Sequence, residues 1–254
     1  MTQVADHPIL LFALSFPCLT LAAWFGSIYR KRYPLPDDAV DGFDVIINAT
    51  LTLLALLIGF TFSMALTRYD QRKNYEEAEA NAIGTEFVRT DLLPASDRAK
   101  VRALLLSYVN ERVLFYTVHD QRQRQQIDAR TTKLQADLWS SVAAPARAQP
   151  TPVAALAVSG MNDVLNSQGY TQAAWWNRIP LAAWALMAAI SICSTVLVGY
   201  DVSNPVGKSR LLVVLPLIIS IAFFLIADIE SPITGIIRVE PRNLLSLLQS
   251  LQAQ

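Results

Sequence analysis

The chain has 254 residues, of which 53% are hydrophobic and only 17% are charged, whereas about 25% of a typical soluble domain is charged. Its 21 basic and 21 acidic side chains balance, so bulk charge favours neither nucleic acid nor an acidic partner. The apolar residues concentrate in four blocks instead of spreading as they would in a soluble core. The composition therefore predicts an integral membrane protein that is embedded in a lipid bilayer.

Each apolar block is long enough to cross a membrane. A spanning helix needs about 20 mostly apolar residues, because about 30 Å of hydrocarbon is crossed at about 1.5 Å per residue. Residues 9–28, 45–66, 179–199 and 211–227 meet this requirement, and none of them contains Lys, Arg or Glu. We therefore predict a protein of the all-α class with four spanning helices.

The residues between the second and third spans predict a helical extramembrane domain. The second span continues from Leu66 into the charged residues 68–73 without Gly or Pro, so one helix should run on to about Pro94. Ser96 is a suitable N-cap for the next helix. The apolar stripe of that helix, from Val101 to Tyr116, also contains Arg112.

This next helix is expected to reach Trp139 or Val142. The three prolines within residues 143–152 predict a turn. A further helix should start at about Val153 and lead to Pro180, which opens the third span.

The predicted organisation has four parts. Residues 1–66 form a first transmembrane hairpin, 67–178 the helical extramembrane domain, 179–230 a second transmembrane hairpin, and 231–254 a C-terminal tail. The tail contains a short, leucine-rich amphipathic segment. The numbers of Lys and Arg beside the spans do not decide which side of the membrane the extramembrane domain faces.

The second span carries a narrow stripe of small and polar side chains. Asn48, Thr52, Ala55, Gly59 and Ser63 recur at three- and four-residue steps, which places them on one helix face. Small residues allow helices to approach closely in lipid, and polar groups can instead line a water-filled path. Periodicity alone favours close packing over pore lining and leaves both interpretations open.

The fourth span ends with two acidic residues, Asp228 and Glu230. An ionisable group at membrane depth indicates a functional site, whereas a solvated helix end is the simpler interpretation. The alternatives are a vestibule that attracts cations and a salt bridge to Arg238.

The helix that continues from the second span carries a mixture of charges. Ion pairs between packed helices are the expected use of these side chains, and a regulatory site is the minor alternative. The residues are Arg68, Asp70, Arg72, Glu76, Glu77, Glu79 and Arg89.

No motif of a known catalytic site occurs in the sequence. The GxSxG, HExxH, P-loop and dinucleotide fingerprints are all missing. Cys18 and Cys193 both lie in apolar blocks, without the spacing of a metal site. We therefore predict no catalytic residue, no metal, no cofactor and no enzymatic activity.

Several segments together resemble the bacterial bestrophin-like domain family, and the resemblance covers most of the chain. The most specific segment begins in the second span and continues into the helix that follows it. The matching segments are residues 57–60, 67–70, 79–85, 89–94, 177–180 and 235–239.

The resemblance implies an ion channel. Bestrophins are homo-pentamers whose second spans line a central pore with a hydrophobic neck, which would fall on Thr52, Leu56 and Phe60. Thr52 is polar, and Asp70 stands where bestrophins have an aromatic residue, so this chain departs from the pattern at both positions. The family also implies a permeant ion, a bacterial inner membrane and a cytoplasmic extramembrane domain. The predicted pore-lining set is Asn48, Thr52, Leu56, Gly59, Phe60 and Ser63, with Asp228 and Glu230 as a vestibule that attracts ions.

Two functions therefore compete. The first is a homo-oligomeric ion channel with an apolar constriction in the second span. The second is a non-conducting membrane scaffold or sensor whose helical domain binds a partner, as the mixed-charge helix and the leucine-rich tail suggest.

Overall fold

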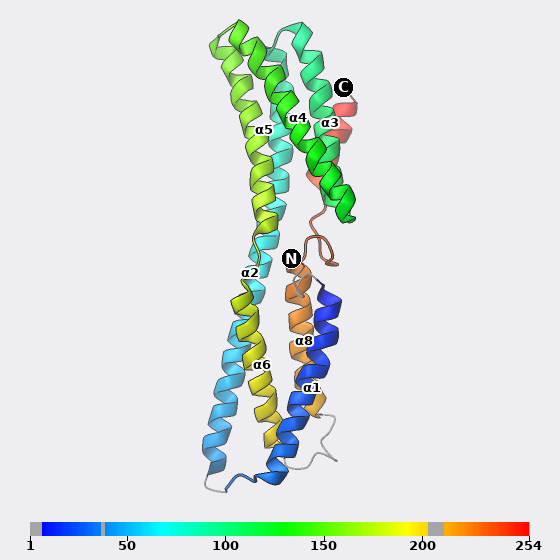
Figure 1. Cartoon of the computed structure of the whole chain (residues 1–254). Helices are drawn as coiled ribbons and strands as arrows, with labels where there is room; N and C mark the ends of the chain where they lie inside the picture. Colours follow the sequence, from blue (N-terminus) through cyan, green and yellow to red (C-terminus); the bar gives the residue numbers. More distant parts are fainter. Residues whose placement is uncertain (1–6, 37–38, 203–210, 254) are drawn as a thin grey trace. The chain divides into compact units, whose positions relative to one another are not determined.

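The computed structural model describes residues 7–36, 39–202 and 211–253. Every regular element in these residues is helical, which confirms the all-α prediction (Figure 1). The elements are α1 (Pro8–Arg32), α2 (Val40–Arg89), the 3-10 helix η3 (Thr90–Leu92), α3 (Ala95–Thr117), α4 (Gln121–Ala148), α5 (Pro152–Trp176), α6 (Leu181–Asp201), α8 (Leu211–Glu230) and α9 (Arg242–Gln252).

The chain divides into two compact units. The membrane unit consists of Met1–Arg68 and Arg178–Arg238, and the helical unit consists of Tyr69–Asn177 and Val239–Gln254. Helix α2 begins in the first and ends in the second. The eight residues 231–238 of the predicted tail thus belong to the membrane unit, and the rest of the tail belongs to the helical unit.

Four helical stretches are long and apolar enough to cross a membrane, which confirms the predicted spans. They lie within Pro8–Arg32, Val40–Leu92, Pro152–Asp201 and Leu212–Glu230. The third stretch combines α5 and α6, and α6 supplies the residues of the predicted third span.

The core of the membrane unit is a cluster of apolar side chains from α1, α2, α6 and α8. Leu19 of α1, Leu54 of α2, Met187 of α6, and Ile219 and Phe223 of α8 are buried against one another. These contacts bury one face of α2 inside the membrane unit. The opposite face of α2 is not part of this core.

Helices α1 and α6 approach each other at two glycines. A Cβ atom on Gly26 would collide with the backbone of Val196, and one on Gly199 would collide with the backbone of Ala23. Small residues at such crossings allow close contact between helix backbones in lipid. These two glycines, which do not belong to the stripe of the second span, allow α1 and α6 to pack closely.

The C-terminal ends of α1 and α6 are also joined. Arg30 Nη1 donates hydrogen bonds to the backbone oxygens of Tyr200, at 3.0 Å, and Asp201, at 2.7 Å. The Tyr200 hydroxyl donates to the backbone oxygen of Tyr33 at 2.7 Å. A cation near the last carbonyls of a helix is favoured by the helix dipole, so Arg30 stabilises the end of α6.

The helical unit packs α3, α4, α5 and α9 with the second half of α2. Helix α3 contacts α4 and α9, and α4 contacts α5. The apolar stripe predicted from Val101 to Tyr116 is buried, including Arg112. The fully buried side chains on the other helices include Ile127, Leu138, Val142, Met161 and Val164.

Two predicted helix boundaries are wrong. Ser96 is not the N-cap of α3, because that helix begins at Ala95 with Pro94 in the cap position and no side-chain cap. The helix also ends at Thr117 instead of reaching Trp139 or Val142. A new helix begins after Asp120, whose carboxylate accepts a hydrogen bond from the Gln123 backbone N–H at 2.9 Å.

The predicted turn within residues 143–152 is shorter than expected. Helix α4 continues through Pro145 to Ala148, and the connection is only Gln149 to Thr151. The Thr151 hydroxyl caps α5 by accepting a hydrogen bond from the Ala154 backbone N–H at 3.1 Å.

Candidate functional site

The six predicted pore-lining residues all lie on the exposed face of α2. At about 100° per residue they occupy a sector of roughly 120° on the helix. The opposite face contains Ile47, Leu54, Thr61 and Ala65, all of which are buried. The exposed residues are Asn48, Thr52, Leu56, Gly59, Phe60 and Ser63.

Among the residues that the structure describes, this face of α2 is not used for packing inside the membrane unit. A Cβ atom on Gly59 would meet nothing within 4 Å. Phe60 is 61% exposed and Leu56 is 52% exposed, so two large apolar side chains are uncovered at the middle of the stripe. Close packing among the described residues of one chain therefore does not explain the stripe. The stripe can instead contact other copies of the chain, lipid or a water-filled path.

The polar members of the stripe lie beside these apolar side chains. The Thr52 hydroxyl donates to the backbone oxygen of Asn48 at 2.7 Å, one turn earlier. The Thr67 hydroxyl donates to the backbone oxygen of Ser63 at 3.0 Å in the same way. Such bonds satisfy the hydroxyl hydrogen, but the carboxamide of Asn48 would still be costly to place in hydrocarbon.

Asp228 holds the turn that follows α8. Its Oδ1 accepts a hydrogen bond from the Ile236 backbone N–H at 2.6 Å, and its Oδ2 accepts one from the Ile237 backbone N–H at 2.8 Å. The residue is 2% exposed. Within one chain the carboxylate is thus buried and stabilises a backbone turn, and its predicted attraction of ions stays a prediction.

Glu230 joins three segments of the membrane unit. Its Oε2 accepts from Arg68 Nη1 of α2 at 3.2 Å and from the Ile179 backbone N–H, before α6, at 2.9 Å. Its backbone oxygen accepts from Arg178 Nη1 at 2.8 Å. The side chain is 4% exposed. The sequence interpretations of Glu230 did not name Arg68 as a partner.

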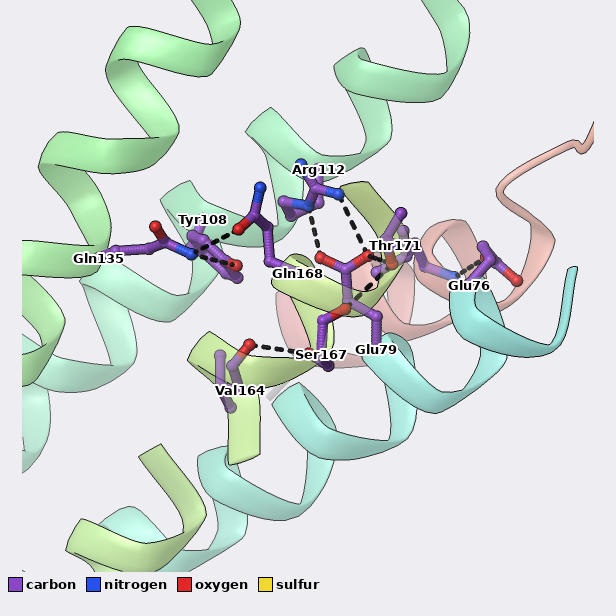
Figure 2. A network of polar contacts seen from close by, with 10 residues as sticks. Glu76, Glu79, Tyr108, Arg112, Gln135, Val164, Ser167, Gln168 and Thr171 are labelled. Atoms are coloured by element: carbon purple, nitrogen blue, oxygen red, sulfur yellow. Dashed lines mark hydrogen bonds and ion pairs between the residues drawn. The ribbon is translucent and has the colours of Figure 1, made fainter. Parts of the chain in front are cut away.

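The helical unit contains a buried ion pair between Glu79 of α2 and Arg112 of α3 (Figure 2). Arg112 Nε donates to Glu79 Oε1, and Arg112 Nη2 donates to Glu79 Oε2 at 3.3 Å. The Thr171 hydroxyl of α5 donates to the same Oε2 at 3.1 Å. Both charged side chains are fully buried, and together with Thr171 the pair connects α2, α3 and α5.

The charges of this pair act on the groups around it. Burial opposes the charge of Arg112, but Glu79 raises the pKa of its guanidinium above the ordinary value. Burial, together with Glu79, raises the pKa values of Tyr108 and Tyr116, so both hydroxyls stay protonated. The Glu79–Arg112 pair confirms the prediction of ion pairs between packed helices. The sequence signal for Arg112 is its position as a charged residue within an apolar stripe.

Glu76, one turn before Glu79, binds the start of α9 through two hydrogen bonds. Its Oε2 accepts from the Asn243 side chain at 2.7 Å, and its Oε1 accepts from the Leu244 backbone N–H at 2.9 Å. A carboxylate at the first turn of α9 satisfies N–H groups that have no partner within the helix. Sequence reasoning did not assign this role to Glu76.

The chain is similar to known proteins of one kind. The model of the bestrophin-like domain matches residues 11–244. Bacterial bestrophin homologues from Klebsiella pneumoniae have a similar fold. One structure, solved by zinc SAD phasing, is 13% identical with a TM-score of 0.65 and covers 96% of this chain and 97% of that chain. A variant with one substitution is 12% identical with a TM-score of 0.65, covering 94% and 97% of the two chains. A search of the curated proteins finds no match.

The spans, the long second helix and these similarities define an all-helical integral membrane protein with the fold of the bacterial bestrophin homologues. The chain belongs to the bestrophin-like domain family. The resemblance noted in the sequence is thereby confirmed.

Proposed function

We propose that the protein is a homo-oligomeric ion channel and not an enzyme, with α2 of each copy lining a central path. The observation that carries this proposal is the exposed face of α2, where Asn48, Thr52 and Ser63 lie beside Leu56 and Phe60. Membership of the bestrophin-like family supports it.

The composition of this face favours a water-filled path over lipid. Moving an amide or hydroxyl without a partner out of water costs roughly 2–7 kcal/mol. A ring of copies that turn this face inward would keep Asn48 and Ser63 hydrated while lipid contacts the apolar faces of α1 and α8. The pentameric state of bestrophins supplies the proposed number of copies.

Leu56 and Phe60 form the proposed constriction. They lie one turn apart, and both side chains are more than half exposed in the single chain. Rings of such side chains can close a path by excluding water. Gly59, next to Phe60, adds no side chain, so the large rings can pack toward the axis.

The location and the span-end carboxylates complete the proposal. Asp228 and Glu230 are proposed to attract ions at the end of α8, and their buried positions make this an effect through the electric field. The charge of Glu230 is balanced by Arg68, so Asp228 supplies most of this field. We propose a bacterial inner membrane and a cytoplasmic helical unit, following the family. The scaffold alternative has less support, because the apolar residues Leu244 and Leu251 of the tail are buried within the helical unit.

Ion flux tests the channel directly. Purified protein in liposomes should pass ions down a chloride gradient or a sodium gradient, tested separately. Phe60→Ala and Leu56→Ala should raise the flux, because each replaces the large apolar side chains at the proposed constriction with smaller ones. Leu14→Ala is the matched control, since Leu14 is an exposed apolar residue of α1 (54%) outside the proposed path.

Two outcomes would contradict the channel. One is the lack of flux in both gradients from a folded oligomer, for the native protein and both α2 variants. The other is an equal change in flux from Leu14→Ala and Phe60→Ala, which would place the effect in the bilayer instead of the path.

A further inference from the structure

Glu86, on the part of α2 that lies in the helical unit, is buried without a partner. The residue has no exposed surface, and neither carboxylate oxygen has a hydrogen bond. About 90% or more of buried polar groups in proteins are hydrogen-bonded. An ionised carboxylate in such a position would be strongly unfavourable, so burial favours the protonated form of Glu86.

Three residues near Glu86 lie on α2 and α5. Its Oε2 lies against Gly160 of α5, where an added Cβ atom would collide with it. Two charged groups act on the carboxyl, Arg89 on its own helix and Asp163 on α5. Burial, opposed by Arg89 and reinforced by Asp163, raises the pKa of Glu86 from 4.5 to about 8.

Arg89 has two carboxylates within reach. It lies three residues after Glu86, so both side chains are on one helix face. Arg89 Nη1 is 4.0 Å from Asp163 Oδ2, the upper limit of an ion pair. The Asp163 side chain is 62% exposed and that of Arg89 is 33% exposed. Asp163 can therefore be hydrated if Arg89 leaves it, whereas Glu86 cannot.

We propose that Glu86 is a proton-binding site that controls the contact between α2 and α5. With the proton bound, Glu86 is neutral and Arg89 pairs with Asp163. When the O–H bond breaks and the proton passes to water, Arg89 leaves Asp163 and supplies the positive charge beside the Glu86 carboxylate. This site does not depend on the proposed channel activity.

The proton should link the stability of the helical unit to pH. Between 4.5, the ordinary pKa, and about 8, the folded protein keeps the proton and the unfolded chain loses it. The unfolding equilibrium constant should therefore rise with pH in this window, by up to about tenfold per pH unit. The stabilisation that this proton supplies is complete below the window and is lost above it.

Infrared spectroscopy of the full-length protein in detergent tests the site. At about pH 6, where ordinary glutamates are ionised, a protonated-carboxyl band should be present in the native protein and lost in Glu86→Gln. Glutamine has the shape of the neutral acid, so the variant should fold. Glu77→Gln, an exposed position on the same helix, should keep the band.

The midpoint of the band distinguishes proton control from simple burial. Asp163→Asn should lower the midpoint, because it removes a negative charge and frees Arg89. Arg89→Gln should raise it. Glu86→Gln should also flatten the dependence of the melting temperature on pH. A band that survives in Glu86→Gln, or a midpoint that moves with neither Asp163→Asn nor Arg89→Gln, would overturn the proposal.

Discussion

Replacing Glu79 by alanine should unfold the helical unit at a much lower temperature. The substitution leaves Arg112, whose side chain is fully buried, without the carboxylate that accepts from its Nε and Nη2 atoms. Removing one member of a buried ion pair costs about 3–5 kcal/mol, because the other charge stays buried and uncompensated. The Thr171 hydroxyl also loses an acceptor at 3.1 Å.

This magnitude corresponds to a large change in melting temperature. For a protein of this size each kcal/mol shifts the midpoint by about 2–4 °C, so we expect a fall of roughly 6–20 °C. Tryptophan fluorescence is a suitable probe of the unfolding. The ring centroid of Trp175 is 4.5 Å from that of Phe115, and the Arg112 guanidinium is 4.4 Å from the centroid of the Phe115 ring.

Two further variants make this prediction decisive. Arg242→Gln breaks an exposed pair with Glu240, whose side chain is 66% exposed, and should cost at most about 1 kcal/mol. The double variant Glu79→Leu with Arg112→Met removes both buried charges and should recover most of the lost stability. The reasoning is refuted if Glu79→Ala melts no earlier than Arg242→Gln.

Two other substitutions test the remaining contacts. Gly199→Ala places a Cβ atom against the backbone of α1 and should lower the free energy of unfolding by about 1–3 kcal/mol. In the control variant Gly59→Ala the added Cβ atom meets nothing within 4 Å, so its stability should stay within about 1 kcal/mol of that of the native protein. Equal melting temperatures for the two variants would contradict the close approach of α1 and α6. Glu76→Ala removes both hydrogen-bond acceptors at the start of α9. Trypsin should therefore cleave the variant after Arg242 roughly 10- to 100-fold faster than the native protein. An unchanged cleavage rate would show that α9 is held by other contacts.

The spans and the grouping of small and polar residues on one face of α2 could be predicted from the sequence because both depend on local patterns. Uninterrupted apolar runs define the spans. The small and polar residues of α2 recur at the helical period, and this pattern places Asn48, Thr52, Ala55, Gly59 and Ser63 on one face. That the face is exposed in the single chain follows from packing, since Leu54 and Ala65 are buried on the other side.

The helix breaks were missed because their signals are weak. Residues 118–120 contain neither Gly nor Pro, and the only local signal there is the capping ability of Asp120. Pro145 suggested a break, but α4 continues through it for three more residues. A proline mainly disturbs the turn that precedes it, so the residues after Pro145 can stay helical.

The polar contacts of the two units could not be predicted in detail, because their partners are distant in the sequence. Arg68 and Glu230 are 162 residues apart, and Glu76 and Leu244 are 168 residues apart. A charge within an apolar stripe, as at Arg112, marks a buried partner without identifying it. The burial of Glu86 has no local signal at all.

The way α1 and α6 are joined limits how the membrane unit can move. Their backbones touch at Gly26 and Gly199, and Arg30 binds the end of α6, so the two helices must shift as one body. Helix α2 meets this unit through apolar side chains such as Leu54, whose contacts have no preferred direction and can slide. The directed contact where α2 leaves the membrane unit, from Arg68 to Glu230, acts as a pivot. A rearrangement of the α2 face would therefore be a swing or rotation of α2 about this point, with α1 and α6 as the fixed frame.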